Sequence, residues 1–283
     1  MARLIINADD LGYSVEINDA VKKCFSLKKI SGASLMPTGG AFLEAVAMLK
    51  SLGIKEIGVH LAITGGLNPS CPERGAVSSV LDKNGAFLSG YLCFAWKYLS
   101  GFSDKRHVYN EFKAQIDRVK AQGFSITHID SHEHVHMLPG IFKIGLRLAK
   151  EYNIPYVRFP YEPSFVIFKN FGVKDILRHT VLKISCLLGL GVLKESGLGS
   201  HAGFLGHFHS GRIDRGVFEF LLGGVKDGVY EIAFHPAVVS DGFIAKYPQY
   251  ANSGIELSVL EGLDQSVLIE KGVKVVSHRD VPN

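Results

Sequence analysis

The chain has 283 residues, of which 47% are hydrophobic and 20% are charged. This composition excludes an intrinsically disordered chain, a collagen-like fibre, a coiled coil and a disulfide-rich scaffold. Lys and Arg total 31 against 27 for Asp and Glu, and this small excess gives no indication of nucleic-acid binding. We therefore expect a soluble globular protein with a large core.

Short apolar runs alternate along the chain with segments of helical periodicity. The predicted strands are 3–7, 33–36, 56–61, 126–131, 156–159, 230–234 and 273–277. The predicted helices are 15–27, 41–52, 88–99, 104–122, 139–152 and 214–222. Regular βα units favour an α/β fold with one parallel sheet, either a TIM-like (β/α) barrel or a doubly wound sheet.

Two segments, residues 65–87 and 162–206, do not follow this alternation and are expected to be loop insertions. The apolar run Ile184–Leu193 is ten residues long, about half of a membrane span. We expect a cytoplasmic protein because the N-terminus has no signal-peptide pattern and the cysteines have no paired spacing. These cysteines are Cys24, Cys71, Cys93 and Cys186.

Acidic and basic side chains stand where the predicted strands end. They are Asp9, Asp10, His60, Asp130, His132, Arg158 and His235. In parallel α/β folds the C-terminal ends of the strands share one face, and that face carries the active site. The sequence therefore predicts a single polar site built from five strands.

Three histidines alternate with other residues in the run 132–136, which reads His-Glu-His-Val-His. On an extended segment, alternate side chains share a face, so we expect His132, His134 and His136 to point together. Imidazoles beside a carboxylate suit a divalent transition metal. The pattern predicts a metal site that stays open to water.

The two adjacent carboxylates of Asp9 and Asp10 suggest two different chemical roles. One carboxylate would bind the metal while the other acts as general base for a water molecule. His235, just before Pro236, is the candidate acid for the leaving group. Arg158 has two interpretations: it orients a substrate, or it pairs with a nearby carboxylate.

Four motifs in this order resemble the YdjC-like carbohydrate deacetylases, which include chito-oligosaccharide deacetylases and hopanoid-associated deacetylases. The motifs are 7–12 (NADDLG), 58–64 (GVHLAIT), 128–139 (HIDSHEHVHMLP) and 234–236 (FHP). The resemblance spans residues 3 to about 280. It implies an irregular single-domain (β/α) barrel that uses one divalent metal, Zn²⁺ or Mg²⁺, to remove acetyl groups from N-acetylated amino sugars.

The resemblance also implies roles for individual residues. Asp10, His60 and His132 match the metal ligands, and Asp9 matches the catalytic carboxylate. His235 lies at the C-terminal His-Pro motif and is assigned as the catalytic acid. The residues assigned to the substrate side are Arg158, His134, His136 and Thr64.

Leu88–Arg106 and Phe165–Leu193 mix aromatic and aliphatic residues with lysines and arginines. Such segments bind membrane interfaces, or they are ordinary helices that cover the barrel. The first interpretation predicts a lipid-linked N-acetylhexosamine substrate and contact with the inner face of the membrane. The second interpretation leaves a soluble chito-oligosaccharide as the substrate. A homo-oligomer is compatible with either interpretation.

Two other functions are compatible with the same residues. A phosphoesterase would bind about two metals per chain. A non-catalytic sugar- or lipid-binding barrel would hold a structural metal closed by four protein ligands.

Overall fold

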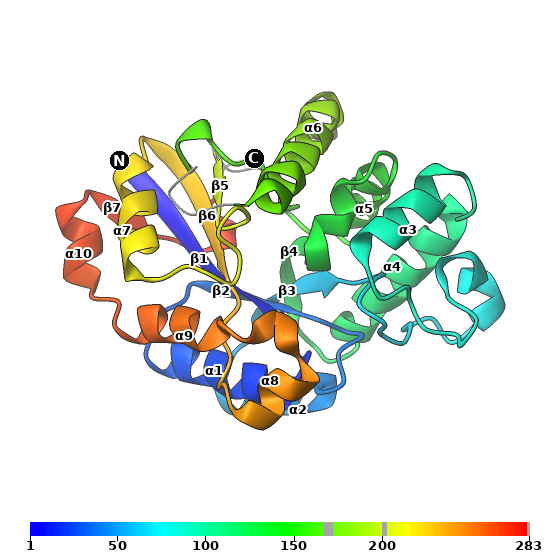
Figure 1. Ribbon diagram of the computed structural model, residues 1–283, viewed down its shortest axis with the longest axis horizontal. Coiled ribbons are helices and arrows are strands. Elements are labelled where there is room, and N and C mark those ends of the chain that lie inside the picture. The colour runs from blue at the N-terminus through cyan, green and yellow to red at the C-terminus, as the bar shows by residue number, and fades with distance from the viewer. Residues whose placement is uncertain (167–171, 200–202, 282–283) are drawn as a thin grey trace.

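The computed structural model describes residues 1–166, 172–199 and 203–281. Its centre is one seven-stranded parallel sheet, in which neighbours follow the order β4-β3-β2-β1-β6-β5, with β7 paired to β1 (Figure 1). The strands are β1 (Ala2–Leu11), β2 (Gly32–Leu35), β3 (Glu56–Leu61), β4 (Ser125–Ser131), β5 (Gly203–Leu205), β6 (Gly228–Phe234) and β7 (Val273–Val275). The predicted α/β fold with a parallel sheet is confirmed.

Helices connect the strands and cover the sheet (Figure 1). The α-helices are α1 (Val15–Ser26), α2 (Phe42–Ser51), α3 (Tyr91–Leu99), α4 (Lys105–Lys120), α5 (Ile141–Glu151), α6 (Val173–Ser196), α7 (Arg215–Gly224), α8 (Asp241–Lys246), α9 (Ser253–Glu261) and α10 (Gln265–Glu270). The 3₁₀ helices are η1 (Arg74–Val80), η2 (His132–Met137), η3 (Ser164–Val166), η4 (Pro248–Tyr250) and η5 (His278–Asp280). Several begin at a side-chain cap, as when Ser14 accepts a hydrogen bond from the Ile17 amide.

Strand β1 is the central strand, and its register positions the site. Ala2–Ala8 pair with Gly228–Phe234 of β6, while the C-terminal half of β1 pairs with β2. Leu4, Ile5 and Ile6 are at most 1% exposed, because both faces of this parallel strand are covered. The C-terminal end of β1 is therefore surrounded by the C-terminal ends of its neighbours.

Residues 156–161 lie against both ends of the strand order. Val157 forms a parallel bridge with Ile129 of β4, and Tyr156 forms one with Gly199. Farther along, the Tyr161 carbonyl accepts a hydrogen bond from the Phe204 amide of β5. The predicted strand 156–159 is thus reduced to isolated bridges at Tyr156 and Val157, because the chain changes neighbours within a few residues.

The second predicted insertion contains regular structure that the sequence did not reveal. Residues 162–206 include η3, the 24-residue helix α6 and strand β5, while 167–171 and 200–202 lie outside the described residues. The first insertion, 65–87, contains η1 and an isolated antiparallel bridge between Leu81 and Phe87. Helices α8 to α10 were also not predicted.

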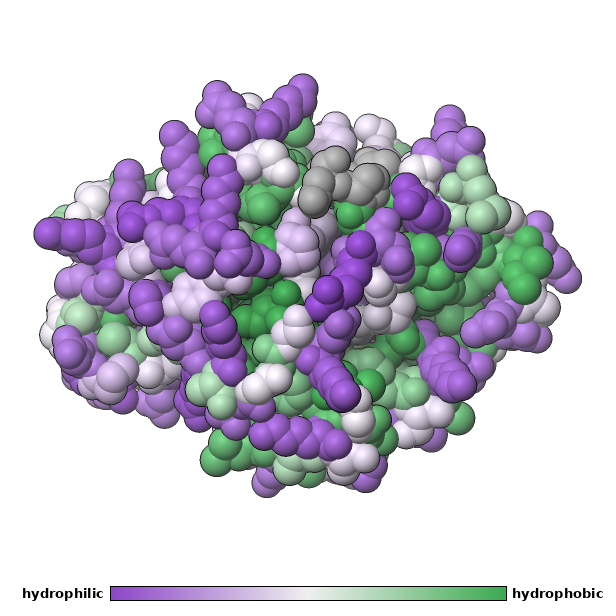
Figure 2. Space-filling view, turned by 180° about the vertical axis from the view of Figure 1, so that it is seen from behind, coloured by the Kyte–Doolittle hydropathy of each residue, from purple (hydrophilic) through white to green (hydrophobic). Residues whose placement is uncertain are grey.

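Helix α6 exposes much of its apolar surface. Within the described part of the chain, α6 alone is long and apolar enough to cross a membrane by length and composition, over Asp175–Ser196, and 33% of its apolar stretch is buried. Its exposed apolar residues are Val173, Ile176, Leu177, Val181, Ile184, Leu187, Leu188 and Leu190. Seen from behind, the molecule has hydrophilic residues over much of one side and smaller hydrophobic patches toward the centre and the other side (Figure 2).

Candidate metal centre

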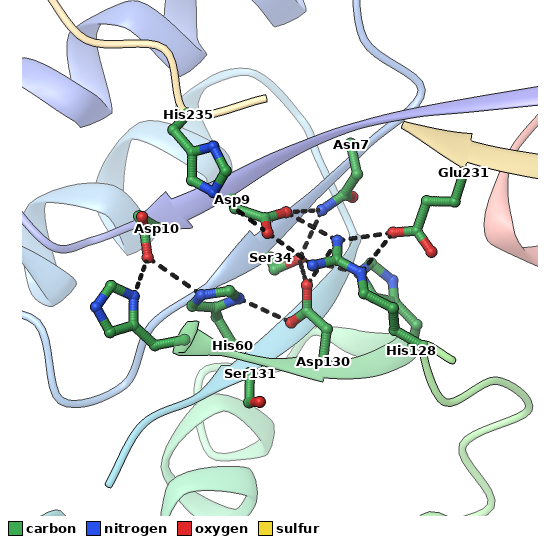
Figure 3. A network of polar contacts seen from close by, with 12 residues as sticks. Asn7, Asp9, Asp10, Ser34, His60, His128, Asp130, Ser131, Glu231 and His235 are labelled. Carbon is green, nitrogen blue, oxygen red and sulfur yellow. Dashed lines mark hydrogen bonds and ion pairs between the residues drawn. The ribbon is translucent and has the colours of Figure 1, made fainter. Parts of the chain in front are cut away.

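Asp10, His60 and His132 meet at the C-terminal edge of the sheet. Asp10 Oδ1 lies 3.1 Å from His60 Nε2 and 2.8 Å from His132 Nδ1 (Figure 3). All three ligand atoms lie within 4.8 Å of one another. One carboxylate and two imidazoles from β1, β3 and η2 form a donor set typical of a catalytic zinc site.

The backbone turns Asp10 toward these histidines. Its φ of 61° lies in the left-handed region, which Asp tolerates better than most residues. The Tyr250 hydroxyl donates a 2.8 Å hydrogen bond to Asp10 Oδ2, leaving Oδ1 to the imidazoles. Burial alone would raise the pKa of Asp10, but His132 and His60 lower it well below its usual range. Asp10 is therefore ionised, as a metal ligand would need to be.

A buried carboxylate orients His60 from behind. Asp130 Oδ1 lies 2.9 Å from His60 Nδ1, so the opposite nitrogen faces Asp10. Asp130 Oδ2 in turn accepts a 2.7 Å hydrogen bond from the Ser34 hydroxyl. Burial lowers the pKa of His60, but Asp130 and Asp10 raise it to about 10. Such a carboxylate–histidine arrangement commonly supports a metal ligand.

Arg158 is fully buried and pairs with three carboxylates. Its Nη1 and Nη2 lie 2.6 and 2.8 Å from the two oxygens of Asp9. Its Nη2 also lies 2.8 Å from Asp130 Oδ2 and 2.7 Å from Glu231 Oε1. Of the two interpretations left open, the structure shows pairing with carboxylates. This pairing leaves the guanidinium without surface for a substrate, since Arg158 is 0% exposed.

A second group of potential ligand atoms, from Asp9, His60 and Asp130, also lies within 4.8 Å. Arg158 binds both of these carboxylates, and a cation there would be repelled by the guanidinium. The Asp10–His60–His132 group therefore fits a metal better. In Figure 3 Asp10 contacts imidazole rings, whereas Asp9 contacts Asn7 and lies beside His235.

Asp9 keeps one oxygen available beside His235. Its Oδ1 accepts hydrogen bonds from Asn7 and Arg158, whereas Oδ2 accepts only one, from Arg158, among the described residues. His235 Nε2 lies 3.9 Å from Oδ2. Burial lowers the pKa of His235, but Glu256 and Asp9 raise it to about 9, so the ring is cationic at neutral pH. A carboxylate and an imidazolium thus face one another.

The three histidines of the run do not share a face, so the predicted extended conformation is wrong. Residues 132–137 form η2, in which Glu133 and His134 have φ of 54° and 52°. His132 joins Asp10, whereas the His136 nitrogens lie 2.5 Å from Ser131 Oγ and 2.9 Å from the Arg158 carbonyl. His136 is fully buried by these contacts.

The remaining predicted residues are His134 and Thr64. The His134 ring turns toward Phe204 and His207. Thr64 lies beyond the end of β3 and is buried, and its hydroxyl has no hydrogen-bond partner within the described residues. No described contact joins Thr64 to the Asp10 cluster.

Sequence reasoning missed several supporting residues, namely Ser34, Glu231, Tyr250 and Glu256. Glu231 had a signal, because an acid in the middle of the apolar run 228–234 needs a buried partner. The other three had none, since their roles depend on contacts over long sequence separations.

A parallel α/β fold with an Asp-His-His cluster at the strand ends, next to an acid–base pair, defines a candidate metallohydrolase. The chain belongs to the YdjC-like protein family, whose model matches residues 3–266. It is 36% identical over 259 residues to the carbohydrate deacetylase of Brevibacillus brevis, covering 91% of this chain and 90% of the relative. It is 24% identical over 267 residues to that of Thermoanaerobacter pseudethanolicus, covering 93% and 92%.

The fold also resembles a solved structure from Enterococcus faecalis V583, a protein whose proposed role is cellobiose-phosphate cleavage. The TM-score is 0.77 at 25% sequence identity, and the match covers 98% of this chain and 97% of the other.

Proposed function

We propose that this protein is a metal-dependent carbohydrate deacetylase that hydrolyses the N-acetyl group of an amino sugar and releases acetate. The Asp10–His60–His132 cluster beside Asp9 and His235 carries this proposal. Three protein ligands leave a coordination position open, as a catalytic centre requires. The curated relatives named carbohydrate deacetylase support the substrate class.

A divalent ion held by the cluster would act as a Lewis acid on the acetyl carbonyl. The two imidazole ligands favour Zn²⁺, and Mg²⁺ is the alternative. Asp9 accepts a proton from the attacking water at Oδ2, its less occupied oxygen. His235 donates the Nε2 proton to the departing sugar amine. The 3.9 Å between these two atoms allows both to act at one reaction centre.

The proposal also concerns the fold, in which the parallel sheet closes into a barrel. Contacts of residues 156–161 with Ile129 on β4 and Phe204 on β5 support closure of the sheet into an irregular single-domain (β/α) barrel.

The surface supports a lipid-linked N-acetylhexosamine as the substrate, with the protein cytoplasmic and bound to the inner face of the membrane. Helix α6 packs against η2, which carries His132, and it also exposes a row of apolar side chains to solvent. Around α3, Leu92, Trp96, Leu99 and Phe102 are each more than 60% exposed. Apolar area of this kind favours an interface with lipid.

Acetate release tests the activity. The metal-loaded protein would be given diacetylchitobiose in water and a polyprenyl-phosphate N-acetylhexosamine in detergent. Release from either supports the deacetylase, and release from the second alone supports the lipid-linked substrate. Release from neither, with phosphate released from phosphate esters and about two metals bound per chain, would establish the phosphoesterase instead.

Vesicle binding tests the surface separately. The double variant Leu177→Ser/Leu188→Ser removes two exposed side chains of α6, and Ile269→Ser on α10 is the matched control at 73% exposure. We expect the double variant to lose sedimentation with anionic vesicles while the control retains it. Equal binding by all three proteins would exclude α6 as the contact.

A further inference from the structure

Two histidine rings meet beside the candidate metal centre, and neither belongs to it. His134 comes from η2 and His207 from the loop after β5, and their ring centroids are 5.1 Å apart with planes inclined by 52°. His134 Nδ1 and His207 Nε2 are both buried, and neither has a hydrogen-bond partner within the described residues. Buried polar atoms of this kind require a partner from solvent or from a ligand.

A short chain of contacts joins these rings to the catalytic residues. The His134 ring packs edge to face on Phe204 at 5.3 Å. The Arg158 guanidinium lies over the Phe204 ring at 5.2 Å and binds Asp9 with its nitrogens. The pair therefore adjoins the side of the site where Asp9 faces His235.

The loop that carries His207 is held rigidly in place. Glu162, which is 2% exposed, accepts hydrogen bonds of 2.9 Å from the backbone amides of His207 and Phe208. The same carboxylate lies 3.0 Å from His179 Nδ1 of α6. Arg178 donates a 2.9 Å hydrogen bond to the His207 carbonyl. Two other segments, the one that carries Glu162 and helix α6, thus hold the backbone at His207, as is typical of the support around a binding residue.

The environment of His207 selects the chemistry of its ligand. Burial, together with the charges of Arg178 and His179, lowers the pKa of His207 to about 3. A neutral imidazole carries one donor and one acceptor nitrogen, which match the hydroxyl group of a sugar. A phosphate would instead favour a protonated ring.

We propose that His207 Nε2 and His134 Nδ1 form a sugar-binding subsite in which both nitrogens hydrogen-bond hydroxyl groups of the amino sugar. This inference rests on the proposed function and adds His207 as a specificity-determining residue.

The kinetic test compares three variants on whichever acetylated sugar the wild type hydrolyses. His207→Phe removes the nitrogen and keeps a ring, and we expect KM to rise about 5- to 10-fold, the loss of one neutral hydrogen bond, with kcat within about twofold. His207→Gln restores a donor and an acceptor and should recover most of the affinity. His209→Gln, two residues along the loop, should leave KM unchanged, because His209 bonds the Val166 carbonyl instead.

An unchanged KM in His207→Phe, or equal losses in the Phe and Gln variants, would overturn the subsite. A direct binding measurement separates this result from failure of the deacetylase proposal. Diacetylchitobiose should shift the imidazole NMR signal of His207 in the wild type, whether or not acetate is released. Absence of that shift at saturating sugar would also overturn the subsite.

Discussion

Arg158 donates hydrogen bonds to both carboxylate oxygens of Asp9, at 2.6 and 2.8 Å, and its own surface is 0% exposed to solvent. This bidentate geometry fixes the orientation of the candidate base before a substrate arrives. The candidate catalytic carboxylate is thus part of the buried core.

Arg158→Met should destabilise the fold strongly, because three buried carboxylates would lose their cation. We expect the free energy of unfolding to fall by about 3–5 kcal/mol, measured by urea denaturation. Arg147→Met, at an exposed i,i+4 pair with Glu151, is the control and should cost less than about 1 kcal/mol. Similar values for the two variants would refute a central role for the buried network.

Asp9→Asn should remove the base while preserving the cluster at Asp10. We expect kcat for acetate release to fall by about 10²–10⁴, because the amide cannot accept the proton from water. Metal content, measured by mass spectrometry, should remain equal to that of the wild type. Full activity in a metal-loaded variant would rule out Asp9 as the base.

Asp130→Asn should weaken metal binding through His60. The amide loses the charge that holds His60 Nδ1, 2.9 Å away, so we expect affinity to fall about 10- to 100-fold in a chelator competition. Asp117→Asn on α4, paired with exposed Lys113, is the matched control. If both variants bind metal as the wild type does, Asp130 has no supporting role.

Glu256→Gln should shift the alkaline limb of the activity profile toward lower pH. The limb reports loss of the His235 proton, and Glu256 is among the groups that raise the pKa of His235 to about 9. Glutamine still accepts the 2.6 Å hydrogen bond from the His235 amide, so the backbone should stay in place. Glu261→Gln, in the same helix, should leave the limb where it is. A limb that does not move in Glu256→Gln would exclude His235 as the acid.

Gly58→Ala should disrupt packing beneath the site. A Cβ at Gly58 would lie 2.2 Å from His128 ring atoms, and His128 Nε2 lies 3.1 Å from the Ser34 hydroxyl that bonds Asp130. We expect a loss of stability on the order of 1–3 kcal/mol or more, measured by thermal unfolding. Gly75→Ala has nothing within 4 Å of its Cβ and should be nearly neutral. Equal melting temperatures would contradict this packing.

The sequence was sufficient to predict which residues gather at the sheet edge, because Asp10, His60 and His235 follow from strand ends alone. It was insufficient for the run 132–136, since two consecutive residues other than glycine at positive φ have no reliable local signature. The buried ion pairs of Arg158 could not be predicted either, because one of its partners is Glu231, an acid 73 positions away on β6. Such pairings are set by tertiary packing and not by periodicity.

The register of β1 against β6 has a consequence for how the acid and the base are spaced. Ala8 pairs with Phe234, and the next residues along the chain at these two positions are Asp9 and His235, whose Oδ2 and Nε2 atoms lie 3.9 Å apart. Successive side chains of a strand point to opposite sides, and a slip of one position would bring Asp10 level with His235 in place of Asp9. The separation of the two candidate proton-transfer groups therefore depends on the strand register, and a single-residue deletion in β1 before Asp9 would put Asp10 in the place of Asp9 and the apolar Leu11 in the place of Asp10.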